Sequence, residues 1–109
     1  MRTLALSVAV VFIAFGSALA EDREACQKRW LEAEAGGIVK GAGVVSGRVT
    51  VVVNETVYSA IDFDVKLGMA RTFECAVAGP GKSLVAVDFV SHRTNKRLAS
   101  WSYGKLTVD

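Results

Sequence analysis

The sequence predicts an α+β domain in which a small antiparallel sheet of three to four strands packs against one helix, with an N-terminal helix disulfide-linked to it. Three observations predict this fold. After residue 20 the patterns follow the order helix, strand, helix, strand, strand. The chain has two cysteines, Cys26 and Cys75, one in each predicted helix. Residues 1–20 resemble a secretory leader, which would place both cysteines in an oxidising compartment.

The first twenty residues predict a cleavable signal peptide, and residues 21–109 predict a single small domain. Arg2 is followed by an uncharged apolar stretch from Leu4 to Phe15, and Ala18-Leu19-Ala20 has the Ala-x-Ala form of a cleavage site. The apolar stretch is shorter than the roughly 20 residues that a membrane-spanning helix needs. We therefore expect an exported protein, periplasmic or secreted, with no integral membrane span after cleavage.

The first predicted helix covers Glu21 to Ala35, where strong helix formers precede Gly36-Gly37. Its apolar face has helical spacing, i, i+4 and i+7, and consists of Cys26, Trp30 and Ala33, with Leu31 beside it. Because a domain of this size gains only marginal stability from its core, a Cys26–Cys75 disulfide is the expected staple. Loop closure over 49 positions corresponds to about 4 kcal/mol.

The second helix is predicted from Phe63 to about Ala78, because Gly79-Pro80-Gly81 ends the helical pattern. One arc of this helix is expected to face the sheet; it contains Phe63, Ala70, Phe73 and Val77. Cys75 points away from that arc, in line with the small residues Gly68 and Thr72. We expect the N-terminal helix to pack on this small-residue face.

The strands are predicted from β-branched and alternating segments. Arg48 to Val53 is a clear strand, and Ser83 to Val90 alternates like a half-buried one. A polar turn from His92 to Lys96 then leads to a second strand, bent or bulged near Gly104, that completes a hairpin. Residues 36–47 contain five glycines and fit either an irregular strand or a flexible loop, and residues 54–60 are transitional.

The hairpin carries the most suggestive surface, here called the basic hairpin surface, made of His92, Arg93, Lys96, Arg97, Trp101 and Tyr103. Positive charge beside aromatic rings can bind an acidic protein partner or an anionic envelope component. The alternative is that the charges keep the hairpin tip soluble and protect an edge strand from mispairing. No nucleic-acid partner is expected, because loss of Arg2 leaves 12 basic and 11 acidic residues, a net charge of +1.

Catalytic and metal-binding patterns are weak. His92 is the only histidine, and no nucleophile motif lies near it in the sequence. One histidine and two cysteines are too few ligands for a typical zinc site. The candidate carboxylates for a hydrolytic pair are Asp62, Asp64, Glu74 and Asp88. Asp62 and Asp64 fall at a predicted helix start, where the helix dipole favours negative charge, so capping explains them better. We therefore assign no catalytic residue, metal or cofactor.

Three functions remain open from the sequence. The leading hypothesis is an exported, non-catalytic small domain that binds a protein or an envelope component. The alternatives are a small secreted or periplasmic hydrolase or envelope-modifying enzyme, centred on a carboxylate or on His92, and a structural or stress-related envelope protein. The sequence alone names no ligand or substrate and no oligomeric state.

Overall fold

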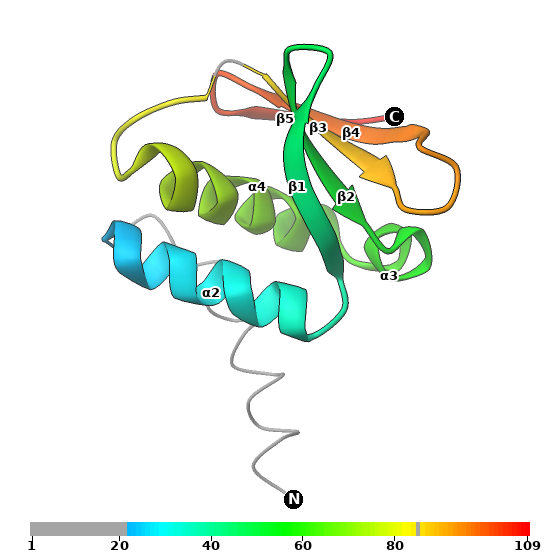
Figure 1. Cartoon of the computed structure of the whole chain (residues 1–109), viewed down its shortest axis with the longest axis horizontal. Helices are drawn as coiled ribbons and strands as arrows, with labels where there is room; N and C mark the ends of the chain where they lie inside the picture. Colours follow the sequence, from blue (N-terminus) through cyan, green and yellow to red (C-terminus); the bar gives the residue numbers. More distant parts are fainter. Residues whose placement is uncertain (1–21, 85) are drawn as a thin grey trace, which may run out of the picture.

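The computed structural model describes residues 22–84 and 86–109, so the proposed signal peptide lies outside the described residues. In order along the chain the elements are α2 (Arg23–Ala35), β1 (Val39–Val45), β2 (Arg48–Val53), α3 (Glu55–Ala60), α4 (Phe63–Ala78), β3 (Val87–Ser91), β4 (Arg97–Ser102) and β5 (Lys105–Val108). Figure 1 shows α4 beneath the sheet and α2 alongside α4 in the opposite direction. Within this part of the chain, no helix is long and apolar enough to cross a membrane.

The α+β class is confirmed, but the sheet is larger than expected and mixed. It has five strands in the order β1-β2-β3-β4-β5, with β2 and β3 parallel and the other neighbours antiparallel. The prediction of an antiparallel sheet of three to four strands was therefore wrong in number and in direction. The reason is the connection from β2 to β3, since α3 and α4 form the long crossover that parallel neighbours require.

Two tight turns account for the additional strands. Ser46 and Gly47 both have positive φ, 51° and 78°, and Tyr103 and Gly104 repeat this at 50° and 80°. Two consecutive residues with positive φ match the twist of a two-residue β-hairpin. The glycine-rich segment is therefore strand β1, and the expected bent strand after residue 96 is two strands, β4 and β5.

Residues 54–60, expected to be transitional, form the short helix α3. The Asn54 side chain caps it by accepting a hydrogen bond of 3.2 Å from the Val57 amide. At the C-terminal end of β3, the buried Ser91 hydroxyl donates to the Glu55 carboxylate of α3 at 2.6 Å. This bond ties the first turn of α3, where the crossover begins, to the C-terminal end of the neighbouring strand β3.

A disulfide joins Cys26 of α2 to Cys75 of α4, as the sequence predicts, with a Cα–Cα distance of 5.8 Å. Side chains on α2 reinforce the link. Arg23 donates to the carbonyl oxygens of Ala76 (3.2 Å) and Val77 (2.8 Å), and Gln27 donates to that of Ala76 (3.0 Å). These are carbonyls of the last turn of α4, which have no partner inside the helix, and a cation there also suits the helix dipole.

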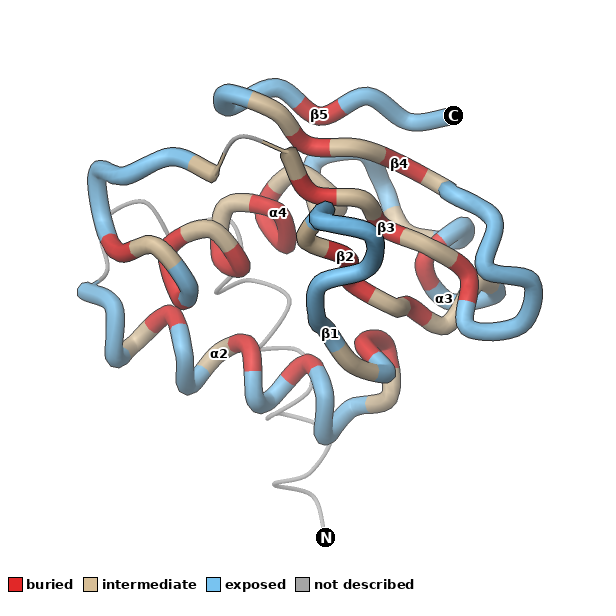
Figure 2. The backbone as a smooth tube through the Cα atoms, turned by 45° about the horizontal axis from the view of Figure 1, so that its top comes forward, coloured by how far each residue is buried: buried red, intermediate tan, exposed pale blue. Residues whose placement is uncertain are grey.

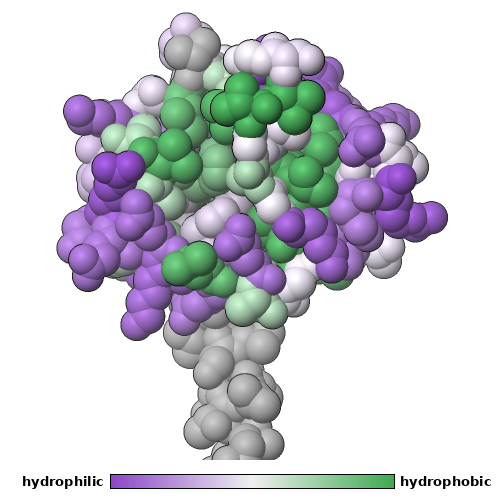
Figure 3. Space-filling view, viewed as in Figure 1, coloured by the Kyte–Doolittle hydropathy of each residue, from purple (hydrophilic) through white to green (hydrophobic). Residues whose placement is uncertain are grey.

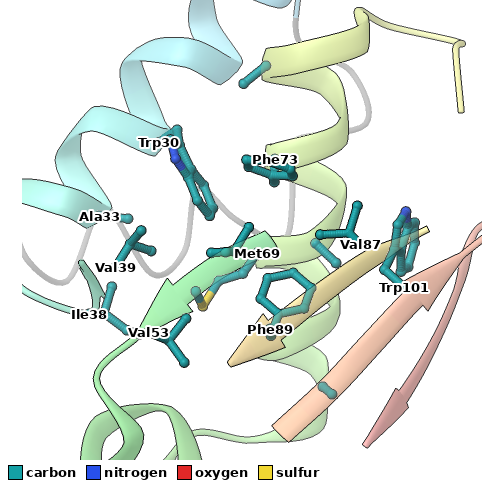
Figure 4. Close-up of a cluster of buried hydrophobic side chains, with 14 of the residues drawn as sticks. Trp30, Ala33, Ile38, Val39, Val53, Met69, Phe73, Val87, Phe89 and Trp101 are labelled. Atoms are coloured by element: carbon teal, nitrogen blue, oxygen red, sulfur yellow. The ribbon is translucent and has the colours of Figure 1, made fainter. Parts of the chain in front are cut away.

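The core lies between the helices and one face of the sheet. Figure 2 shows buried and partly exposed positions alternating along β3 and β4. Figure 4 shows Trp30 and Phe73 pointing toward each other from the two helices, with Met69 above Phe89 of the sheet; the ring centroids of Trp30 and Phe73 are 4.9 Å apart. The expected sheet-facing arc of α4 is only partly buried, since Phe63 and Val77 are 50% and 44% exposed.

Replacing both cysteines by serine tests how much the disulfide contributes to the stability of the fold. We expect the free energy of unfolding of the oxidised protein to exceed that of the Cys26→Ser/Cys75→Ser variant by about 2–4 kcal/mol, because the disulfide restricts the unfolded chain. Urea denaturation of both proteins measures the difference. Two alkylatable thiols in the non-reduced native protein, detected by mass spectrometry, or equal unfolding midpoints would contradict this account.

Candidate binding groove

The basic hairpin surface is less continuous than its sequence indicates. His92, Arg93 and Lys96 are exposed in the turn between β3 and β4. Arg97 is engaged, because its Nε donates to the Asp109 carboxylate at 2.7 Å. Tyr103 is 73% exposed, but it lies in the separate turn between β4 and β5.

Trp101 does not belong to that surface, since it is only 1% exposed and lies on the helix-covered face of β4. Its indole N–H donates to Glu74 of α4 at 2.9 Å, and the same carboxylate oxygen accepts a hydrogen bond from the Leu84 amide at 2.9 Å. Glu74 therefore joins α4, the segment before β3, and β4. The Trp101 side chain belongs to the core and is not available to a partner.

The candidate carboxylates are held by structural contacts or lie at a helix start. Arg48 makes two hydrogen bonds to Asp88, of 2.7 and 2.8 Å, and the hydrogen bonding lowers the pKa of the Asp88 carboxyl below its ordinary value. Asp62 occupies the N-cap position of α4 without a side-chain capping bond, and Asp64 lies in the first turn. Glu74 is the core carboxylate that binds Trp101.

The His92 region also has structural partners. The His92 amide donates to the Val53 carbonyl at 3.0 Å, and ring atom Nδ1 lies 3.2 Å from the same oxygen. The neighbouring Ser91 hydroxyl donates to Glu55 and accepts from the amides of Arg93 and Thr94 at 3.1 and 3.3 Å. These contacts fix the loop. Among the described residues, no group of three His, Cys, Asp or Glu side chains is placed to hold a metal ion.

A hydrophobic groove lies between α2, α4 and β1, and it was not foreseen from the sequence. It has a volume of about 380 Å³ and is lined by Gln27, Trp30, Leu31, Ala42, Phe73, Ala76 and Val77. None of these lining side chains is charged. Figure 3 shows hydrophobic side chains gathered over the centre and top of this face, with hydrophilic ones along its margins.

Exposed apolar side chains line and extend the groove. Leu31 on α2 is 62% exposed, Val77 on α4 is 44% exposed, and Val44 of β1 is 71% exposed. Ala42 and Val44 are register partners of Val51 and Val49, so they lie on the helix-covered side of the sheet. A group of exposed apolar residues around a concavity is typical of an interaction site.

Strand β1 borders the groove and forms one edge of the sheet, because β2 is its only neighbour. An edge strand directs half of its backbone N–H and C=O groups away from the sheet. Of the seven residues of β1, only Lys40 is charged. Added Cβ atoms at Gly41 and Gly43 would meet no atom within 4 Å, so the folded chain itself leaves both positions open. The edge is thus largely apolar and accessible.

Comparison of the chain with protein-family models, curated proteins and solved structures finds no match. The protein is a small α+β domain with a helix–helix disulfide, a feature compatible with export. Its described part contains a neutral hydrophobic groove beside an open sheet edge.

Replacing Glu74 tests whether it supports the core. Glu74→Ala leaves the Trp101 indole N–H and the Leu84 amide without their acceptor, so we expect a loss of about 1–3 kcal/mol in the free energy of unfolding. Glu74→Gln, which keeps an acceptor oxygen, serves as the matched control and is expected to lose less. Chemical denaturation followed by tryptophan fluorescence measures both. Equal stabilities of Glu74→Ala and wild type would show that these hydrogen bonds do not stabilise the fold.

Proposed function

We propose that this protein is an exported, non-catalytic binding domain that holds an extended segment of another protein against β1. The observation that carries the proposal is the position of the hydrophobic groove directly beside the open edge of the sheet. A segment added as a further strand would satisfy the outward backbone groups of β1. Its alternate side chains would enter the groove, as in other cases of strand addition.

The chemistry of the groove favours an apolar polypeptide over other ligands. Trp30, Leu31, Phe73 and Val77 offer apolar surface, and the lining has no charge to attract an ion. An apolar ligand without a polypeptide backbone would make no use of the outward N–H and C=O groups of β1, which would stay bonded to water. An extended peptide with small or branched apolar residues at every second position satisfies both requirements.

The basic hairpin surface supports an anionic partner less well. Trp101 is buried, and Arg97 is paired with Asp109. Arg93 and Lys96 remain as exposed cations in the turn, and so few charges give little electrostatic attraction at physiological salt. We therefore assign recognition to the groove and treat the basic hairpin surface as the competing site in the test.

Selection of peptides from a displayed random library on the oxidised protein tests this assignment. We expect the enriched peptides to have apolar residues at alternate positions. Ala42→Lys places a charge on the groove side of the exposed strand β1 and should weaken peptide binding at least about tenfold. Thr107→Lys, on the opposite edge strand β5, is the matched control and should bind normally.

Charge reversal of the turn separates the two surfaces. The Arg93→Glu/Lys96→Glu variant should bind the selected peptides with unchanged affinity. Enrichment of acidic peptides that this variant no longer binds would overturn the groove assignment in favour of the basic hairpin surface. Unchanged binding by Ala42→Lys, with a melting temperature equal to that of wild type, would also contradict the proposal.

A further inference from the structure

A second, smaller pocket lies between the two crossover helices and the last two strands. It has a volume of about 230 Å³ and is lined by Tyr58, Ser59, Lys66, Leu98, Val108 and Asp109. Unlike the groove, it combines charged and hydroxyl groups with an apolar wall. The groove's lining residues do not take part in it, so the two sites are separate.

The Tyr58 hydroxyl is the unusual group of this pocket. The side chain is 1% exposed and its ring stacks on Phe89, with centroids 5.9 Å apart. Within the described part of the chain, the buried hydroxyl has no hydrogen-bond partner. Burial raises the pKa of Tyr58 well above its ordinary value, so the group keeps its proton and remains a donor. Among the described residues the Thr72 hydroxyl is also buried without a partner, but only Tyr58 of the two lines this pocket. A rare unpartnered donor beside a pocket points to a group that is supplied from outside.

The charges around the pocket favour an anion. The Lys66 ammonium lies over the Tyr58 ring, with Nζ 5.3 Å from the ring centroid, and no acidic side chain of the described residues forms an ion pair with it. The Asp109 carboxylate also lines the pocket, but Arg97 binds it at 2.7 Å and offsets its charge. Ser59 adds a second hydroxyl.

We propose that this pocket binds a small aliphatic carboxylate, with the carboxylate between Lys66 and the Tyr58 hydroxyl and the carbon chain against Leu98 and Val108. The ammonium supplies the charge, and the Tyr58 and Ser59 hydroxyls supply directional hydrogen bonds. The volume is below the roughly 300–1,000 Å³ of typical drug-sized sites, which limits the ligand to a few carbon atoms.

Butyrate is a suitable probe, titrated into the ¹⁵N-labelled oxidised protein. Saturable shifts are expected at the amides of Ser59, Lys66 and Val108, with a dissociation constant on the order of 1 mM, as a ligand with six non-hydrogen atoms allows. n-Butylammonium has the same number of carbon atoms and the opposite charge, and should cause no saturable shift. Its binding in place of butyrate would assign the pocket to cations through Asp109 and overturn the proposal.

Two variants separate ligand binding from folding. Lys66→Met should weaken butyrate binding at least about tenfold, whereas Lys82→Met, outside the pocket, should leave it unchanged. Tyr58→Phe keeps the stacked ring and should weaken binding several-fold, with a melting temperature of the free protein equal to or above that of wild type. A lower melting temperature for Tyr58→Phe, or wild-type affinity in both pocket variants, would refute the proposed roles.

Discussion

The contact between α2 and α4 is the constraint on which the rest of the structure depends. The Cys26–Cys75 disulfide fixes one end of α2, and Arg23 and Gln27 bind carbonyls of the last turn of α4. Trp30 then packs against Phe73 further along both helices. Because α2 meets the sheet mainly through β1, this contact is what attaches it to the domain.

The same contact produces the groove. A helix packed only for stability would direct its apolar residues into the core, but Leu31 remains exposed beside the buried face of Cys26, Trp30 and Ala33. Its neighbours across the groove, Val77 and Ala42, are exposed as well. Exposed apolar surface beside an unprotected sheet edge favours aggregation unless a partner covers it. This is the physical reason for placing recognition there.

Some of the described polar groups in and around the core are paired, and others are not. The half-buried Glu74 accepts hydrogen bonds from Trp101 and the Leu84 amide, and the buried Ser91 donates to the half-buried Glu55. These paired groups connect distant segments of the chain. The Tyr58 hydroxyl departs from this pattern, and it does so in a pocket that also contains Lys66. The Thr72 hydroxyl of α4 is likewise buried without a hydrogen-bond partner in the described part of the chain, but Thr72 does not line this pocket, so only the Tyr58 hydroxyl is assigned to a ligand.

The sequence predicts those features that depend on local pattern. Both long helices were predicted, because their spacing and their glycine terminators are local signals, and the disulfide followed from two cysteines and the predicted compartment. The parallel pairing of β2 with β3 was missed, since strand direction is set by the whole crossover and the short helix α3 has a weak pattern. The five glycines of residues 36–47 fit both a strand and a loop, and only the pairing of β1 with β2 decides for a strand.

The candidate sites were harder to predict because they combine distant segments. The groove brings together α2, β1 and α4, and no single segment contains its pattern. Trp101 is a partial exception: Ala99 and Trp101 alternate with Ser100 and Ser102, and this period of two places the indole on the buried face. Trp101 was nevertheless assigned to the basic hairpin surface, because it follows basic residues closely in the sequence.

Amide hydrogen exchange of the oxidised and reduced protein tests the central claim that the disulfide holds α2 in place and thereby forms the groove. On reduction, the amides of α2 are predicted to exchange much faster, while those of β2, β3 and β4 keep their protection, because the sheet packs on α4 independently of the staple. Protection of α2 that is unchanged by reduction, or an equal loss of protection in every element, would contradict the account.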